Sequence, residues 1–222
     1  MSNFSNQTWL SNYPAHAPKT IEENEHTILD LYEKTIIAHP YQTAISCHEV
    51  DFSFSKIDDL ATKFASYLQN DLGIKKGDRV AIVLPNCVQF TISLFACIKI
   101  GAVFVNTNPL YTADELESIF NNCNVKVAIV MDMFAHHIQK ARMNIHSLEN
   151  VIVTNIADVY PFPKKQIIGF ISKRLIKSKP NYNKNTFIQF TTVLKADKKL
   201  YVRPIISKEN TLCLQYSSGT TG

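Results

Sequence analysis

Patterns typical of buried strands alternate with patterns typical of helices between residues 79 and 154, and this alternation constrains the fold of the chain. The strand patterns are apolar runs rich in β-branched residues, at 79–84, 102–106, 125–130 and 151–154. The helical patterns fill the intervals, at 88–100, 112–122 and 133–146. Because parallel strands are joined by long, right-handed crossovers, this order predicts an α/β fold with a doubly wound, mostly parallel sheet flanked by helices.

The predicted helices carry recognisable end signals. Residues 55–71 place apolar side chains on one face, and Ser55 followed by Asp58 predicts a capping box at the start of this helix. Thr112 and Glu115 predict a second capping box. Just before it, Asn108 and Pro109 with Tyr111 could contact a substrate, but a turn that opens a capped helix explains them without any ligand, and the structural role is favoured.

The composition favours a reduced, globular protein and names no partner. The chain has 222 residues, of which 45% are hydrophobic, and its net charge of +4 is too small to indicate nucleic-acid binding. Its five cysteines include no CxxC pair, which is typical of a cytoplasmic protein. The N-terminus lacks the pattern of a signal peptide, and the longest apolar stretch, at 92–105, is too short to span a membrane.

No metal site is expected within this chain. His136 and His137 form the one adjacent histidine pair, and no cysteine or carboxylate is spaced to join them as a ligand. The alternation of strands and helices stops at about residue 155, and prolines and polar residues predict an insertion or linker at about 155–205.

The last residues, LCLQYSSGTTG (212–222), predict a strand followed by a loop of glycines and hydroxyl side chains. Glycines allow backbone N–H groups to approach a phosphate closely, and serine and threonine add further donors. The spacing differs from that of the GxxxxGK[ST] loop. A solvent-exposed loop is the alternative interpretation, but the preceding strand favours phosphate binding, because open α/β sheets bind ligands at the carboxyl ends of their strands.

The same segment resembles the start of the signature loop of the adenylate-forming superfamily. Two further motifs of that superfamily occur upstream in the expected order, FSFSKIDDLA (52–61) and CIKIGAVFVNTNPLYTADEL (97–116). Within the superfamily, WLSNYP (9–14), LGIKKGDRVAIVLPN (72–86) and NPLYTADELE (108–117) are similar to bacterial long-chain fatty acid–CoA ligases. The resemblance covers nearly the whole chain and is weakest from about 155 to 200.

This resemblance implies ATP-dependent activation of a long-chain fatty acid to acyl-CoA through an acyl-adenylate. It implies that the reaction uses ATP, Mg²⁺ and coenzyme A, the last as a co-substrate. Binding of all three would require a C-terminal part that is missing from these 222 residues. Residues 1–222 would be the N-terminal part of an AMP-binding domain, incomplete, without catalytic residues and inactive alone. The expected ATP-binding residues are Tyr216, Ser217, Ser218, Gly219, Thr220, Thr221 and Gly222. The alternatives are a non-catalytic, membrane-associated remnant and a ligase for another carboxylate.

Residues 164–179, KKQIIGFISKRLIKSK, combine six basic residues with apolar ones and contain no acid. As a helix, this segment would place Ile168, Ile171 and Leu175 on one side, which favours peripheral binding to the anionic inner face of a membrane. A helix packed on the parent domain or at a homodimer contact is the alternative. The expected membrane-surface residues are Lys164, Lys165, Lys173, Arg174 and Lys177.

Overall fold

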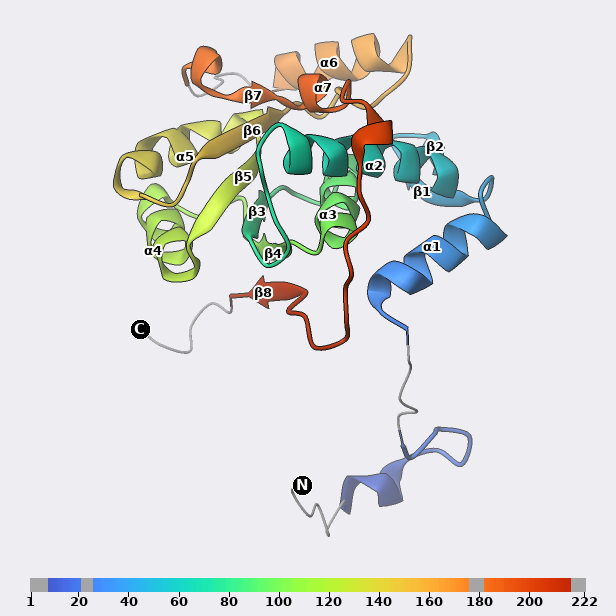
Figure 1. The fold of residues 1–222 in the computed structure, drawn as a ribbon. Helices are drawn as coiled ribbons and strands as arrows, with labels where there is room; N and C mark the ends of the chain where they lie inside the picture. Colours follow the sequence, from blue (N-terminus) through green and yellow to red (C-terminus); the bar gives the residue numbers. More distant parts are fainter. Residues whose placement is uncertain (1–7, 21–25, 176–181, 217–222) are drawn as a thin grey trace.

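The computed structural model describes residues 8–20, 26–175 and 182–216, apart from the side chains of residues 173 and 175. Its centre is a six-stranded sheet of order β7-β6-β5-β3-β4-β8, in which every neighbouring pair is parallel (Figure 1). The strands of this sheet are β3 (Arg79–Val83), β4 (Val103–Asn106), β5 (Val125–Met131), β6 (Asn150–Thr154), β7 (Ile188–Gln189) and β8 (Cys213–Gln215). The predicted α/β fold with a parallel sheet is confirmed.

Seven α-helices and a small hairpin complete the part of the chain that the structure describes. The helices are α1 (Ile28–Ala38), α2 (Phe54–Asn70), α3 (Val88–Ile100), α4 (Ala113–Cys123), α5 (Ala135–Ala141), α6 (Lys164–Leu175) and α7 (Phe190–Val193). The antiparallel hairpin is formed by β1 (Thr43–Cys47) and β2 (Val50–Ser53). Short 3₁₀ helices span Thr8–Asn12, Asp132–Phe134, Arg142–Asn144, Lys184–Thr186 and Lys198–Leu200.

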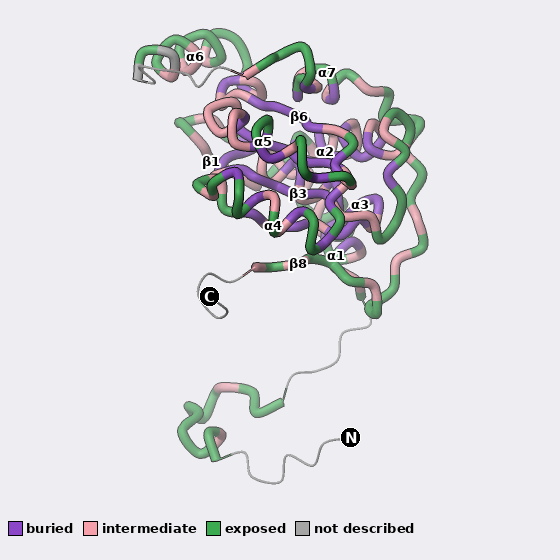
Figure 2. The backbone as a smooth tube through the Cα atoms, turned by 90° about the vertical axis from the view of Figure 1, so that its left-hand side faces the viewer, coloured by how far each residue is buried: buried purple, intermediate pink, exposed green. Residues whose placement is uncertain are grey.

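Both faces of the sheet are covered, which explains why its strands are almost continuously apolar. Along β3, Val80 and Ile82 pack with α2, α3 and α7, whereas Ala81 and Val83 pack with α4 and α5 on the other face. Buried residues are therefore concentrated in the central strands (Figure 2). Since successive side chains of a strand point to opposite faces, each apolar strand contributes to both hydrophobic cores.

Of the two capping boxes predicted from the sequence, the structure contains one and lacks the other. The Thr112–Glu115 capping box at the start of α4 is confirmed. The predicted Ser55–Asp58 box is wrong, because the cap lies two residues earlier, at Ser53, and α2 begins at Phe54. Its cap is Ser53, whose hydroxyl accepts the N–H of Lys56 at 3.2 Å. Ser53 ends β2 in an extended conformation, as a capping residue must, whereas Ser55 already lies in the first helical turn.

The segment expected to be an insertion, at about 155–205, contributes to the domain itself. It forms α6, adds β7 to the edge of the sheet and forms α7, in which Phe190 and Val193 are fully buried. Residues 194–212, here called the return segment, then cross the molecule from the β7 edge to the β8 edge (Figure 1). Its attachment includes a hydrogen bond from the Ser66 hydroxyl to the Asp197 carbonyl at 2.8 Å.

Candidate functional site

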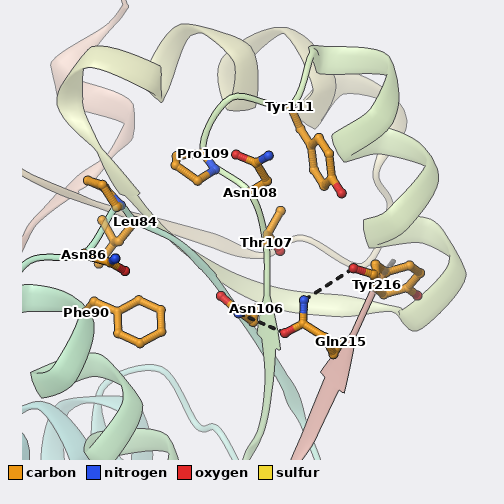
Figure 3. A pocket seen from close by; sticks show the side chains of 11 residues that line it. Leu84, Asn86, Phe90, Asn106, Thr107, Asn108, Pro109, Tyr111, Gln215 and Tyr216 are labelled. Atoms are coloured by element: carbon orange, nitrogen blue, oxygen red, sulfur yellow. Dashed lines mark hydrogen bonds between the residues drawn. The ribbon is translucent and has the colours of Figure 1, made fainter. Parts of the chain in front are cut away.

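A polar cavity of about 540 Å³ lies at the carboxyl ends of β3, β4 and β8 (Figure 3). The loop after β3 leads to α3 on one face of the sheet, and the loop after β4 leads to α4 on the other. The two loops therefore diverge and leave a crevice, which is where open α/β sheets hold ligands. The cavity is lined by Leu84, Pro85, Asn86, Phe90, Asn106, Thr107, Asn108, Pro109, Tyr111, Gln215 and Tyr216.

Hydrogen bonds between the strands fix the floor of this cavity. Asn106, the last residue of β4, lies in register with Ile82 of β3 and with Gln215 of β8. Its amide donates to the Gln215 side-chain oxygen at 2.9 Å, and the Gln215 amide donates to the Tyr216 carbonyl at 3.3 Å (Figure 3). The Thr107 N–H donates to the Ile82 carbonyl at 3.1 Å. The polar groups at the floor are thus held in place before any ligand binds.

The loop after β4 forms one wall of the cavity and is a turn. The Asn108 side-chain oxygen accepts the Leu110 N–H at 3.0 Å, and the Asn108 carbonyl accepts the Tyr111 N–H at 3.1 Å. This side-chain turn agrees with the structural interpretation of Asn108 and Pro109. The same residues also line the cavity, so a structural role and a place in the site coexist.

Tyr216 is the one expected ATP-site residue that the structure describes. It follows β8, and its hydroxyl donates to the Asn122 side-chain oxygen at 2.5 Å. Burial raises the pKa of the Tyr216 phenol to about 12, with a further contribution from Cys123. At neutral pH this phenol is therefore a neutral hydrogen-bonding group. The other six expected residues, 217–222, lie outside the described residues; β8 runs parallel to β4 and leads into them at the carboxyl edge.

The lining residues that the structure describes include no charged side chain and no strong acid or base. Its amides, hydroxyls and aromatic rings can bind and orient a polar ligand, but they cannot transfer a proton efficiently at neutral pH. Among the described residues, no group of three His, Cys, Asp or Glu could hold a metal ion. No chemical step is assigned to the Mg²⁺ expected from the resemblance.

Asn106, Thr107 and Gln215 are site residues that sequence reasoning missed. Each lies at or just beyond the carboxyl end of a strand, and that position was the available signal. Their convergence depends on β8 pairing with β4 although about a hundred residues separate the two strands, and no local pattern encodes that pairing.

Residues 32–222 match the AMP-binding enzyme family, and the chain belongs to that family. Among curated relatives, it is 35% identical to a long-chain-fatty-acid–CoA ligase of Haemophilus influenzae over 96% of its own length. It is 34% identical to one of Bacillus subtilis over 98%. It spans 38% and 39% of these two relatives, respectively.

Solved structures agree with this assignment at the level of the fold. The anthranilate CoA ligase AuaEII in complex with anthranoyl-AMP superimposes with a TM-score of 0.72 and 22% identity, over 90% of this chain and 34% of that chain. A long-chain-fatty-acid-CoA ligase from Archaeoglobus fulgidus gives a TM-score of 0.68 and 19% identity, over 91% of this chain and 36% of that chain. The α/β architecture is therefore shared with adenylate-forming ligases that act on different acids.

The second expected site, the basic segment, is helical as α6 over Lys164–Leu175. Ile168 of this helix packs against the core, whereas Ile171, one turn further along, is 48% exposed. Lys164 forms an ion pair with Glu49 at 3.1 Å, while Lys165 and Arg174 are exposed. The side chain of Lys173 and all of Lys177 lie outside the description.

Proposed function

We propose that this chain forms part of an enzyme that activates long-chain fatty acids with ATP, through an acyl-adenylate, to acyl-CoA. The observation that carries the proposal is the family match over residues 32–222, together with curated relatives that are named long-chain-fatty-acid–CoA ligases. The cavity at the carboxyl ends of β3, β4 and β8 supports it, because β8 ends at that edge and the glycine-rich segment 217–222 follows soon after it in the sequence.

In this proposal the described residues bind and position the nucleotide rather than perform the chemistry. A carboxylate oxygen of the fatty acid attacks the α-phosphorus, and pyrophosphate leaves. Backbone N–H groups and hydroxyls of the 217–222 segment would hold the departing phosphates; preorganised donors each contribute about 2.7–4 kcal/mol in other enzymes. Asn106 and Gln215 fix the strand from which that segment emerges.

The test compares acids and variants in a polypeptide that contains this chain and extends to the length of its curated relatives. We expect ATP-dependent formation of palmitoyl-CoA, and weakened ATP binding when Asn106→Ala removes the amide from the cavity floor. Asn121→Ala, on the exposed side of α4, is the matched control. If the protein activated another acid but not palmitate, the proposed substrate class would be refuted.

A ligase for another carboxylate is the second candidate, since the anthranilate ligase shares the fold. The comparison of palmitate with anthranilate in the same assay separates the two. For the 222-residue chain alone we expect no turnover and at most weak ATP binding, because the described part of the cavity lining has no charged group. Micromolar affinity in a calorimetric titration would contradict this expectation.

We further propose that α6 attaches the protein to an anionic membrane surface. Ile167, Phe170 and Ile171 are 52%, 63% and 48% exposed, and Lys165 and Arg174 lie exposed on the same helix. Apolar side chains beside cations suit the boundary between headgroups and acyl chains. No described helix has the length and apolar character that crossing a bilayer requires.

Sedimentation with phosphatidylglycerol vesicles tests this attachment. We expect the native chain to pellet, and Phe170→Ser with Ile171→Ser to remain largely in the supernatant. Ile205→Ser is the control, because Ile205 is 88% exposed on the return segment, away from α6. Equal pelleting of all three proteins would exclude α6 as the attachment site.

A further inference from the structure

A second cavity, of about 370 Å³, lies between β1 and the start of α3 and is lined by two cysteines. Cys47 borders it from β1, and Cys87 borders it from the N-terminal end of α3. The cavity shares Asn86 and Phe90 with the larger polar cavity described above. A chemical change at these thiols therefore acts on a wall that the two cavities have in common.

Cys47 is half-buried and has a base beside it. Its sulfur lies 3.3 Å from Nδ1 of His48, and the same nitrogen lies 2.8 Å from the hydroxyl of Tyr160. His48 and Glu49 have φ of 49° and 57°, in the left-handed region, which makes the β1–β2 turn tight. Lys164 of α6 holds this turn by donating to the carbonyls of both residues, at 3.2 and 3.3 Å. The imidazole is thus kept next to the thiol.

Cys87 is the N-cap of α3 and is 8% exposed. Burial raises the pKa of its thiol, the N–H groups of Phe90 and Gln89 oppose that rise, and a negative charge on Cys47 adds to it. The two cysteines line the same cavity and act on each other electrostatically. Cys87 remains protonated at neutral pH, so the more exposed Cys47, with its imidazole, is the thiol that reacts first.

We propose that Cys47 and Cys87 form a redox-sensitive dithiol site that hydrogen peroxide converts to a disulfide. The Cys47 thiol gives its proton to His48, and its sulfur attacks peroxide, so that a sulfenic acid and water form. The Cys87 sulfur then attacks the Cys47 sulfur, and a second water leaves as the disulfide closes. Both thiols are oxidised by two electrons in total, and one peroxide is reduced to two waters.

The disulfide joins β1 to the start of α3. Asn86 and Phe90 flank this position and line the polar cavity, so oxidation changes the shape of that cavity. Only this consequence for ligand binding rests on the proposed function. The formation of the disulfide depends on the thiols alone.

The experiment counts and maps thiols before and after treatment with hydrogen peroxide. It uses the Cys213→Ser variant, because Cys213 is exposed and would form disulfides between molecules. Of the five cysteines, four remain in this variant, and we expect titration of the denatured protein to fall from four free thiols to two. Peptide mass spectrometry should then find the Cys47 and Cys87 peptides linked, and dithiothreitol should restore four thiols.

Three further variants in the same background separate chemistry from general damage. Cys87→Ser should leave Cys47 as a sulfenic acid that dimedone labels, and Cys123→Ala, which changes a buried cysteine outside this cavity, should still form the linked peptide. His48→Gln should slow alkylation of Cys47 at neutral pH several-fold, because it removes the imidazole that takes the thiol proton. Circular dichroism verifies that each variant is folded.

The inference would be overturned if, in the native protein, Cys47 and Cys87 stayed reduced while peroxide oxidised exposed thiols. It would also be overturned if the two cysteines formed disulfides with other cysteines instead. In the complete protein, a linked peptide without palmitate activation would refute the proposed function and leave the dithiol site intact. Palmitate activation without a linked peptide would do the reverse.

Discussion

Glu115 shows how one side chain at a helix start becomes sensitive to pH. Its carboxylate accepts the Thr112 N–H at 2.7 Å and the Thr112 hydroxyl at 2.8 Å. These hydrogen bonds to the charged form hold the pKa of Glu115 below its usual 4.5. The contribution of the pair to stability is therefore complete above pH 4.5 and is lost as the pH falls through the lower folded value.

We expect the free energy of unfolding of the native chain to fall more steeply between about pH 5 and about pH 3 than that of Glu115→Gln, which has no charge to lose. Urea unfolding at each pH measures both slopes. Glu117→Gln, on the same helix, is the control. Identical slopes for Glu115→Gln and the native chain would show that the capping carboxylate has no thermodynamic effect.

At the scale of elements, β7 and α7 decide whether the segment around 155–205 is separate from the domain. Phe190 at the start of α7 is fully buried and packs edge-to-face on Phe64 of α2, with ring centroids 5.3 Å apart. An appendage would not place a large side chain in the same core as the helices of the central fold. The segment therefore shares a hydrophobic core with the central fold.

Phe190→Ala tests this integration. We expect the variant to lose about 3–5 kcal/mol of unfolding free energy, since it removes a ring from a closely packed core. Ile205→Ala, at the exposed part of the return segment, should change stability by less than about 0.5 kcal/mol. Urea denaturation followed by far-ultraviolet circular dichroism measures both. If Phe190→Ala lost as little unfolding free energy as the control, α7 would not contribute to the stability of the domain.

At the scale of the whole molecule, Lys99 joins parts of the chain that are distant in sequence. Its ammonium is almost fully buried, forms an ion pair with Asp58 of α2 at 2.8 Å, and lies 5.6 and 5.4 Å from the ring centroids of Tyr32 and Tyr201. The Tyr201 hydroxyl also donates to the Lys99 carbonyl at 3.0 Å. This one residue of α3 thus contacts α1, α2 and the return segment.

Replacing Lys99 by Ala should cost about 3 kcal/mol of unfolding free energy, because it leaves the Asp58 carboxylate unpaired. This is the low end of the range for breaking a buried pair, since Asp58 remains partly exposed. Asp58→Asn in the same background should recover part of the loss. Thermal unfolding of the two variants provides the measurement, and a Lys99→Ala protein as stable as the native one would contradict the role given to this residue.

The sequence by itself determined the elements and the parallel fold class, because strand and helix periodicity and capping signals are local. Strand β3 and the Thr112 cap lie where their patterns predicted. The tertiary structure decided that β8 pairs with β4, that β7 joins the opposite edge, and hence that Asn106 meets Gln215. It also placed Cys47 and Cys87 around one cavity. These meetings depend on contacts between residues far apart in the chain, which no short stretch of sequence encodes.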